Sequence, residues 1–278
     1  MNFLILFFSS FLDVTQTVLT KKSSIRTDGK FMLSFNAFKS IGALVVLLLL
    51  LGMNFSVNLP TVILGTMYGL LLLSSMCTSF MALNCGNMAS TAIIISYSVI
   101  IPFLFGGIVL HEPIGFLQIT GLFLMLLSIL LMNFRKSGEG FGVKWLLFTF
   151  SCFVTNGLCS VVQKLHQTAY PGQYCKEFMT VAFGVITLIL LTVLFIKYRG
   201  VETNTSKTAL TSGMCTGGAY LLALYLSSVF NATVLFPIIA VCGAVLNCVA
   251  SRMFFKDKLR KIQLIAIAIG VISVIFMS

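Results

Sequence analysis

Long apolar runs alternate with short polar connections along the whole chain. A transmembrane helix needs about 20 mostly apolar residues, and ten runs reach that length. They cover roughly residues 2–20, 31–51, 61–83, 89–110, 115–133, 145–164, 177–196, 208–228, 233–254 and 260–277. The strands of a membrane barrel would instead be stretches of about ten residues of alternating character. The pattern therefore predicts an all-α polytopic membrane protein with ten transmembrane helices.

Composition supports the same class. Only 9% of the residues are charged and 58% are hydrophobic, with a mean hydropathy of +1.06. An ordinary soluble domain carries about 25% charged residues to cover its surface. The chain is therefore not expected to be a soluble enzyme, a disordered chain or a secreted disulfide scaffold.

The net charge of +11 comes from basic residues that gather on alternate connections. Fifteen of the 18 Lys and Arg residues lie in or beside the connections that follow the first, fifth, seventh and ninth runs. The exceptions are Lys164 and Lys176 on the other side and Lys39 inside the second run. Because Lys and Arg accumulate in cytoplasmic loops, we expect a multi-pass protein of the cell membrane with both termini outside. The positive charge then marks orientation, and no nucleic-acid partner is expected.

The second half of the sequence resembles the first. Several polar and small residues recur in the same order about 145 residues later, pairing Asp13, Lys21, Gly65, Gly69, Glu112 and Gln118 with Asn156, Lys164, Gly213, Gly217, Asp257 and Gln263. Because each unit crosses the membrane an odd number of times, five, its second copy enters from the opposite side, as in many secondary transporters. The sequence predicts two inverted five-helix repeats, residues 1–133 and 145–278, joined by a linker at 134–144.

Polar residues line one face of the first predicted helix and the matching face of the sixth. At helical spacing these are Asp13, Gln16, Thr17 and Thr20, and then Asn156, Cys159, Ser160 and Gln163. In hydrocarbon such faces must turn toward each other or toward water. One interpretation is a shared substrate cavity at the repeat axis, and the other is a dry hydrogen-bonded seam between helices.

Asp13 is the one acidic residue in the interior of a predicted span. Ionisable groups in the membrane are costly and often mark ion or substrate pathways. Asp13 is therefore predicted to exchange a proton or to hold a cationic group during transport. The alternative is a structural carboxyl that is kept neutral by burial or is paired with Lys39 or Lys164.

Further hydrogen-bonding side chains could line the same cavity, namely Tyr68, Ser75, Tyr97, Tyr220 and Asn247. Their alternative role is helix packing. The recurring glycines are expected to allow close helix contact. Glu112 is expected to be structural, near the start of the helix that follows it.

The sequence lacks the residues that several classes of chemistry require. The sequence has no phosphate-binding loop of the G-x-x-x-x-G-K-[ST] type, so no ATP is expected. Its eight cysteines form no C-x-x-C pair, and its two histidines are far apart. No Ser, His and Asp could meet at one membrane face as a catalytic triad. We expect no metal, no cofactor and no enzymatic activity.

The chain resembles EamA-type members of the drug/metabolite transporter superfamily over essentially its whole length. The features that carry this resemblance are two five-helix halves and an acid closing the fourth helix of each half, in Leu110-His111-Glu112-Pro113 and Phe255-Lys256-Asp257-Lys258. Phe11-Leu12-Asp13-Val14 also resembles the first helix of small multidrug resistance transporters, where an acid binds protons and cationic drugs. The resemblance implies a central cavity lined by helices 1, 3, 4, 6, 8 and 9. Ten-helix relatives commonly have cytoplasmic termini, whereas the charge pattern here predicts the opposite.

The sequence thus favours a secondary transporter that moves a small metabolite or drug-like solute by alternating access, with proton coupling through Asp13 as one route. The mostly neutral predicted cavity argues against a multiply anionic substrate. An uptake carrier or facilitator for a sugar or similar metabolite is an alternative, as is a non-transporting membrane subunit or sensor. A monomer in the lipid bilayer is expected, with a dimer left open.

Overall fold

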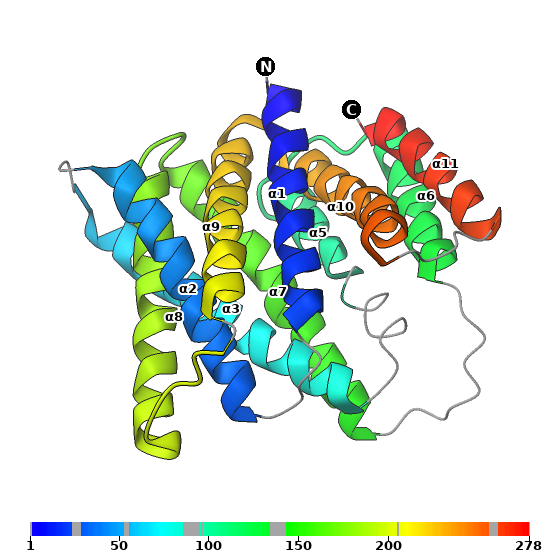
Figure 1. Cartoon of the computed structure of the whole chain (residues 1–278). Helices are drawn as coiled ribbons and strands as arrows, with labels where there is room; N and C mark the ends of the chain where they lie inside the picture. Colours follow the sequence, from blue (N-terminus) through cyan, green and yellow to red (C-terminus); the bar gives the residue numbers. More distant parts are fainter. Residues whose placement is uncertain are drawn as a thin grey trace. The chain divides into compact units, whose positions relative to one another are not determined.

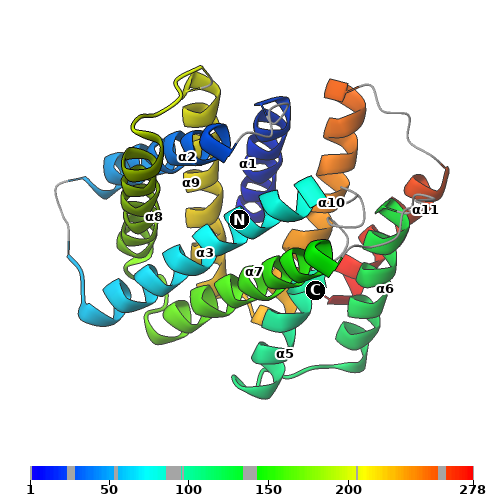
Figure 2. The same ribbon diagram turned by 90° about the horizontal axis from the view of Figure 1, so that it is seen from below.

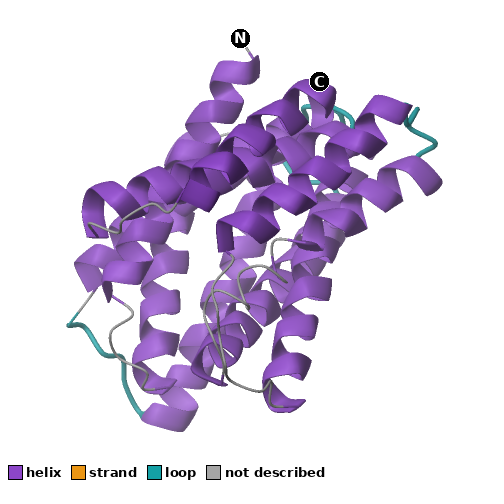
Figure 3. Cartoon of the chain, turned by 90° about the vertical axis from the view of Figure 1, so that its right-hand side faces the viewer, coloured by secondary structure: helices purple, strands orange, loops and turns teal. Residues whose placement is uncertain are grey.

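The computed structural model describes residues 2–23, 29–52, 56–85, 95, 97–133, 143–204, 206–255 and 261–277. These residues form helices and connecting loops, with no strand among them (Figure 3). The all-α prediction is therefore confirmed for this part of the chain.

The helices fall where the apolar runs predict them (Figure 1). Their bounds are α1 Asn2–Ser23, α2 Gly29–Leu51, α3 Leu59–Cys85, η1 Tyr97–Val99, α5 Ile100–Ile108, α6 Phe116–Asn133, α7 Val143–Ala169, α8 Cys175–Tyr198, α9 Ser206–Val229, α10 Ala232–Phe255 and α11 Lys261–Met277. The fourth predicted run is seen as the 3₁₀ turn η1 and the short helix α5, and its beginning lies outside the described residues.

Six of the described helices, α1, α2, α3, α7, α8 and α9, are long and apolar enough to cross a membrane. Many large apolar side chains on the helices are also exposed, such as Leu4 at 74%, Phe116 at 82% and Ile196 at 78%. Contiguous apolar surface is costly in water but not against lipid tails. Length, composition and exposure thus agree on a membrane environment.

The helices divide into two compact units. Unit 1 holds residues Met1–Leu70 and His166–Ser228, and unit 2 holds Leu71–Leu165 and Val229–Ser278. Helices α3 and α7 contribute residues to both units. Each unit therefore takes helices from both halves of the sequence.

In unit 1, α2 packs along α8 (Figures 1 and 2). Helix α8 has a buried apolar residue at every fourth position, with Phe178, Ala182, Ile186, Leu190 and Leu194 all at most 2% exposed. Polar contacts join the same two helices. Thr187 donates to the Ser40 hydroxyl at 2.9 Å, and the Lys176 ammonium donates to the Leu50 carbonyl at 2.8 Å.

Glycines bring two more helices of unit 1 into backbone contact with this pair. On α3, a Cβ added to Gly69 would lie 2.7 Å from the Ala182 carbonyl oxygen of α8. On α9, a Cβ on Gly217 would lie 2.9 Å from the Ala43 carbonyl oxygen of α2, and one on Gly213 would overlap the Lys39 carbonyl. The predicted close contact at these glycines is confirmed.

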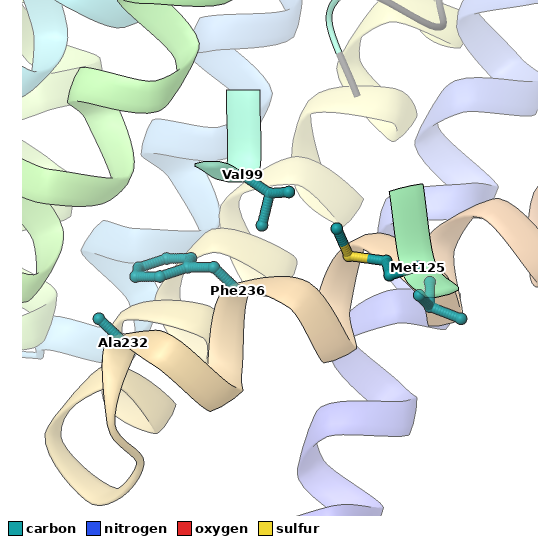
Figure 4. Close-up of a cluster of buried hydrophobic side chains, with 5 residues drawn as sticks. Val99, Met125, Ala232 and Phe236 are labelled. Atoms are coloured by element: carbon teal, nitrogen blue, oxygen red, sulfur yellow. The ribbon is translucent and has the colours of Figure 1, made fainter. Parts of the chain in front are cut away.

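In unit 2, α6 packs along α11, and α10 packs against α5. A cluster of buried apolar residues joins η1, α6 and α10, with Val99, Met125, Ala232, Phe236 and Val241 at its centre (Figure 4). The Ser128 hydroxyl of α6 donates to the Ala266 carbonyl of α11 at 2.7 Å.

Glu112 binds the beginning of α10, which corrects the expectation that it acts at the helix following it. Its carboxylate accepts from the backbone N–H groups of Ala232 at 3.0 Å and Thr233 at 3.1 Å, and from the Thr233 hydroxyl at 3.2 Å. An anion at this position satisfies unpaired N–H groups and the helix dipole. Local sequence patterns do not reveal this contact, because the partners are 120 residues apart.

Lys164 of α7 completes this cluster. Its ammonium lies 3.3 Å from the Glu112 carboxylate, both side chains being about nine-tenths buried, and donates to the Phe230 carbonyl at 2.8 Å. The lysine therefore neutralises the capping acid and binds the carbonyl of Phe230, two residues before α10. We name Glu112, Lys164 and the first turn of α10 the α10 cap.

Replacing glycines at the helix contacts is expected to destabilise the protein. Gly69→Ala and Gly213→Ala force a methyl group against backbone that cannot rotate away, and overpacking of this kind costs about 1–3 kcal/mol. Gly243→Ala is the matched control, since nothing lies within 4 Å of its added Cβ. Thermal unfolding in detergent, followed by far-UV circular dichroism, should show lower midpoints for the first two variants. An equal midpoint for all three would contradict the packing described.

Removing the capping acid is expected to lower the free energy of unfolding more than removing an ordinary acid from a first helical turn. Glu112→Ala leaves the Lys164 ammonium buried without its partner, a change that typically costs about 3–5 kcal/mol. Glu177→Gln, in the first turn of α8, should cost only about 0.3–1 kcal/mol. In a double-mutant cycle of thermal unfolding, Lys164→Met and Glu112→Ala should be strongly non-additive. Additive effects would mean that the interaction between Glu112 and Lys164 contributes nothing to the stability of the fold.

Candidate functional site

The polar face of α1 lies opposite its exposed apolar face. Leu4, Phe7, Phe8 and Phe11 follow one another at helical spacing and are each more than half exposed. Asp13, Gln16, Thr17 and Thr20 follow the same spacing on the other side of the helix. The sequence thus places large apolar side chains where lipid would be and directs the polar ones toward unit 1.

Gln16 is the centre of a hydrogen-bonded network in unit 1. Its amide nitrogen donates to the Asp13 carboxylate at 3.1 Å, and its amide oxygen accepts from the Lys39 ammonium of α2 at 2.6 Å. Since an ammonium can only donate and a carboxylate can only accept, the amide has one orientation. Gln16 therefore bridges an acid and a base on two neighbouring helices.

Helix α9 holds this network from a third side. The Ser212 hydroxyl donates to the Gln16 backbone carbonyl at 3.2 Å and lies 3.2 Å from the Thr20 hydroxyl. The next residue, Gly213, is the one in contact with the Lys39 carbonyl. A side chain at Gly213 would hold α9 away from α2, so this glycine sets the position of Ser212.

The two threonines on the polar face of α1 donate hydrogen bonds to their own helix. Thr17 donates to the Asp13 carbonyl and Thr20 to the Gln16 carbonyl, both at 2.8 Å. Back-bonding to the preceding turn satisfies each hydroxyl proton without a partner helix. Gln16 is the residue of this polar face that links α1 to α2, and Thr20 also contacts Ser212 of α9.

Opposite charges balance each other in this network. Asp13 and Lys39 are both half-buried and interact electrostatically across the Gln16 amide. Lys39 is thus the basic residue next to Asp13, whereas Lys164 belongs to the α10 cap of unit 2. We name Asp13, Gln16 and Lys39 the α1–α2 charge relay.

The two predicted tyrosines of unit 1 pack against α8. Tyr68 is only 2% exposed, and its ring lies 5.4 Å from that of Phe178, while the Tyr220 ring lies 6.2 Å from that of Phe183. These ring contacts fix both tyrosines from the side of α8. Their role in a cavity stays a prediction.

Asn156, Tyr97 and Ser75 belong to unit 2 and have polar contacts within that unit. The Asn156 amide donates to the Ser98 hydroxyl of η1 at 2.8 Å, and the Tyr97 hydroxyl donates to the Leu126 carbonyl at 3.2 Å. Ser75 lies 3.6 Å from the Cys152 sulfur. The structure therefore joins α7 to η1 and to α3 at these positions.

Three predicted residues of unit 2 remain. Ser160 is half-buried and Gln163 is buried, both on α7. The Asn247 side chain lies outside the described residues. The polar face of α1 belongs to unit 1 and that of α7 to unit 2. The predicted cavity between these two faces stays a prediction.

His166 is fully buried in unit 1 and has a partner at each ring nitrogen. Its Nε2 lies 3.0 Å from the Thr61 hydroxyl, and its Nδ1 lies 2.9 Å from the Gln167 amide. Among the residues that the structure describes, no group of three or more His, Cys, Asp or Glu side chains could hold a metal ion. His166 thus serves packing and hydrogen bonding.

Comparisons with known proteins give the fold. No protein-family model matches this chain, and none of the curated proteins matches it. A solved structure described only as "Crystal structure of protein" matches with a TM-score of 0.74 and 17% sequence identity, covering 98% of this chain and 94% of that chain. At this identity the match shows a common fold along almost the full length of both chains.

Proposed function

We propose that the chain is a secondary transporter that carries a small solute across the cell membrane. The observation that supports this most directly is the α1–α2 charge relay. Its acid and its base lie inside α1 and α2, two of the helices long enough to span a membrane. Charged side chains at such positions are rare and usually line the path of an ion or solute.

The α10 cap uses its charges at a helix N-terminus, whereas Asp13 and Lys39 lie within α1 and α2. Ser, Thr and Asn side chains join membrane helices at lower cost, and the chain uses them elsewhere, as between Thr187 and Ser40. An ion pair instead requires desolvation that its own attraction barely offsets. Asp13 and Lys39 are therefore better explained by chemistry with a solute or a proton than by helix packing.

Matching glycine contacts support the proposal of two inverted five-helix repeats. Gly65 and Gly69 of α3 contact α8 at Phe178 and Ala182, while Gly213 and Gly217, each 148 residues later, contact α2 at Lys39 and Ala43. Lys39 and Ala43 lie 139 residues before Phe178 and Ala182 in turn. The third helix of each half thus packs on the second helix of the other half, as a two-fold relation between the halves requires.

We further propose ten spans, EamA-type membership and alternating access by rocking of the two halves. The basic connections would lie in the cytoplasm, and Asp13 would carry the coupling proton. Export of a metabolite or drug-like compound is the favoured direction. The full-length fold match and the six long apolar helices are compatible with this assignment.

Metabolite profiles of cells and medium test the transport proposal. Cells that express the protein should shift at least one solute between the two compartments relative to cells without it. Asp13→Asn should reduce that shift about tenfold or more, because losing one charged contact costs 2–5 kcal/mol. Thr15→Val is the matched control, since Thr15 lies on the opposite face of α1 and bonds only its own helix.

Two results would count against the proposal. Profiles that do not differ between cells with and without the protein would favour a sensor or a subunit. Flux through Asp13→Asn with an unchanged pH dependence would remove the coupling role from Asp13 while leaving transport in place.

A further inference from the structure

Three basic side chains meet at one end of unit 1, where α2 begins and α8 ends. Lys30 lies in the first turn of α2, and Lys197 and Arg199 lie at the end of α8. We infer that these three residues bind the phosphate group of an anionic phospholipid. The surface is separate from the α1–α2 charge relay, and the inference does not depend on the transport function.

Contacts at both ends of the α2–α8 pair place these residues together. At one end the Lys176 ammonium donates to the Leu50 carbonyl, so the beginning of α8 lies at the end of α2. At the other end a Cβ added to Gly29 would lie 3.2 Å from the Tyr198 hydroxyl. The two helices therefore run antiparallel (Figure 1). The three basic residues, which adjoin Gly29 and Tyr198 along the chain, belong to the same end of the pair.

No acid of the described chain balances these charges. Elsewhere the buried or half-buried lysines have internal acceptors, as Lys164 has in Glu112 and Lys39 has in the Gln16 amide. Among the residues that the structure describes, no carboxylate forms an ion pair with the three basic residues at this end of unit 1. Their charges are therefore available to an anion from outside the protein.

The position of Lys30 is unfavourable for its own helix. A cation at the beginning of a helix meets the positive end of the helix dipole, and the first turn of α2 contains no acid. Lys197 and Arg199 lie at the negative end of α8, which attracts cations. The helix dipole thus explains the two basic residues of α8 but not Lys30.

The connections at this end add to the positive charge. The Glu202 N–H group donates to the Ser34 hydroxyl at 3.0 Å, which holds the connection between α8 and α9 against α2. Residues 21–30 and 197–207 together contain seven basic residues and two acids. An anionic head group would offset part of this excess.

An exposed apolar side of α8 leads to the basic residues and favours a lipid over a soluble anion. Leu188, Phe195 and Ile196 are 61–78% exposed and lie on one side of the helix, at positions i, i+7 and i+8. Lys197 and Arg199, both exposed, follow within one turn. Acyl chains can lie along this side of α8 while the phosphate meets the basic groups.

Tyr198 and Arg199 suit the boundary between lipid tails and head groups. The Lys197 ammonium lies 5.5 Å from the centre of the Tyr198 ring, and tyrosine is common at membrane–water interfaces. Arg199 ends α8 in the left-handed conformation, with a φ of 51°, where glycine is favoured. A guanidinium can bind a phosphate through two parallel hydrogen bonds, which explains an arginine at this strained position.

Thermal unfolding of the purified protein in detergent tests the inference. The probes are phosphatidylglycerol, phosphatidylcholine with the same acyl chains, and glycerol 3-phosphate as a soluble phosphate. A ligand that binds the folded state raises the midpoint of unfolding. Phosphatidylglycerol should raise it more than phosphatidylcholine does, and glycerol 3-phosphate at the same concentration should leave it unchanged.

Substitutions locate the site. Lys30→Gln, Lys197→Gln and Arg199→Gln should each weaken phosphatidylglycerol binding about fivefold, the loss expected for one basic contact to an anionic lipid. Lys144→Gln is the matched control, since Lys144 is an exposed basic residue in the first turn of α7, away from this end of unit 1.

Two further variants of Arg199 separate binding from stability. Arg199→Lys keeps the charge but loses the planar pair of donors, so it should also weaken binding of the lipid. Arg199→Gly should weaken binding without lowering the midpoint of the lipid-free protein, because glycine favours a positive φ. A merely structural role of Arg199 would lower that midpoint.

Three results would overturn the inference. Equal shifts with both lipids would mean that the head-group charge is not recognised. An equal loss of binding in Lys144→Gln would indicate diffuse attraction by the net positive charge. A shift with glycerol 3-phosphate as large as that with phosphatidylglycerol would indicate a site for a soluble anion. None of these results bears on the α1–α2 charge relay, so the transport proposal would stand.

Discussion

An apolar surrounding does not tolerate an unbalanced charge, and the polar contacts of this chain follow from that constraint. Two ionic clusters join an acid to a base: Asp13 of α1 is linked to Lys39 of α2 through Gln16, and Glu112 of the loop between α5 and α6 pairs directly with Lys164 of α7. The two clusters balance the charge of the acid with different partners. Glu112 also meets the positive end of α10, whereas Asp13 interacts with the Gln16 amide and with Lys39.

Close packing of backbones makes this balance geometrically feasible. Gly213 lets α9 approach α2 at Lys39, and its neighbour Ser212 then reaches the Gln16 carbonyl. Small residues and polar network are thus one feature: the glycine removes the volume and the serine supplies the hydrogen bond. A larger residue at Gly213 would separate three helices and disrupt the support of the relay.

The sequence predicts the helices well and the partners poorly. Apolar runs of sufficient length locate the helices, and the spacing from Asp13 to Thr20 identifies the polar face of α1, because both depend on local periodicity. The bridge from Gln16 to Lys39 depends on a rotamer and on the approach of α2, which periodicity does not encode. Glu112 shows the same limit, since the helix that it caps begins 120 residues later.

The sequence separation of the two clusters has a consequence for biosynthesis. Lys39 follows Gln16 by only 23 residues, so the relay can form once the first helical hairpin has entered the membrane. Glu112 leaves the ribosome long before the start of α10 and must wait for Lys164 and then for Ala232. Its charge lacks both partners until Lys164 is synthesised and lacks the N–H groups of α10 until Ala232 follows, so the α10 cap is completed late in assembly. A chain that ends before α10 would leave this acid without the helix N-terminus that it caps.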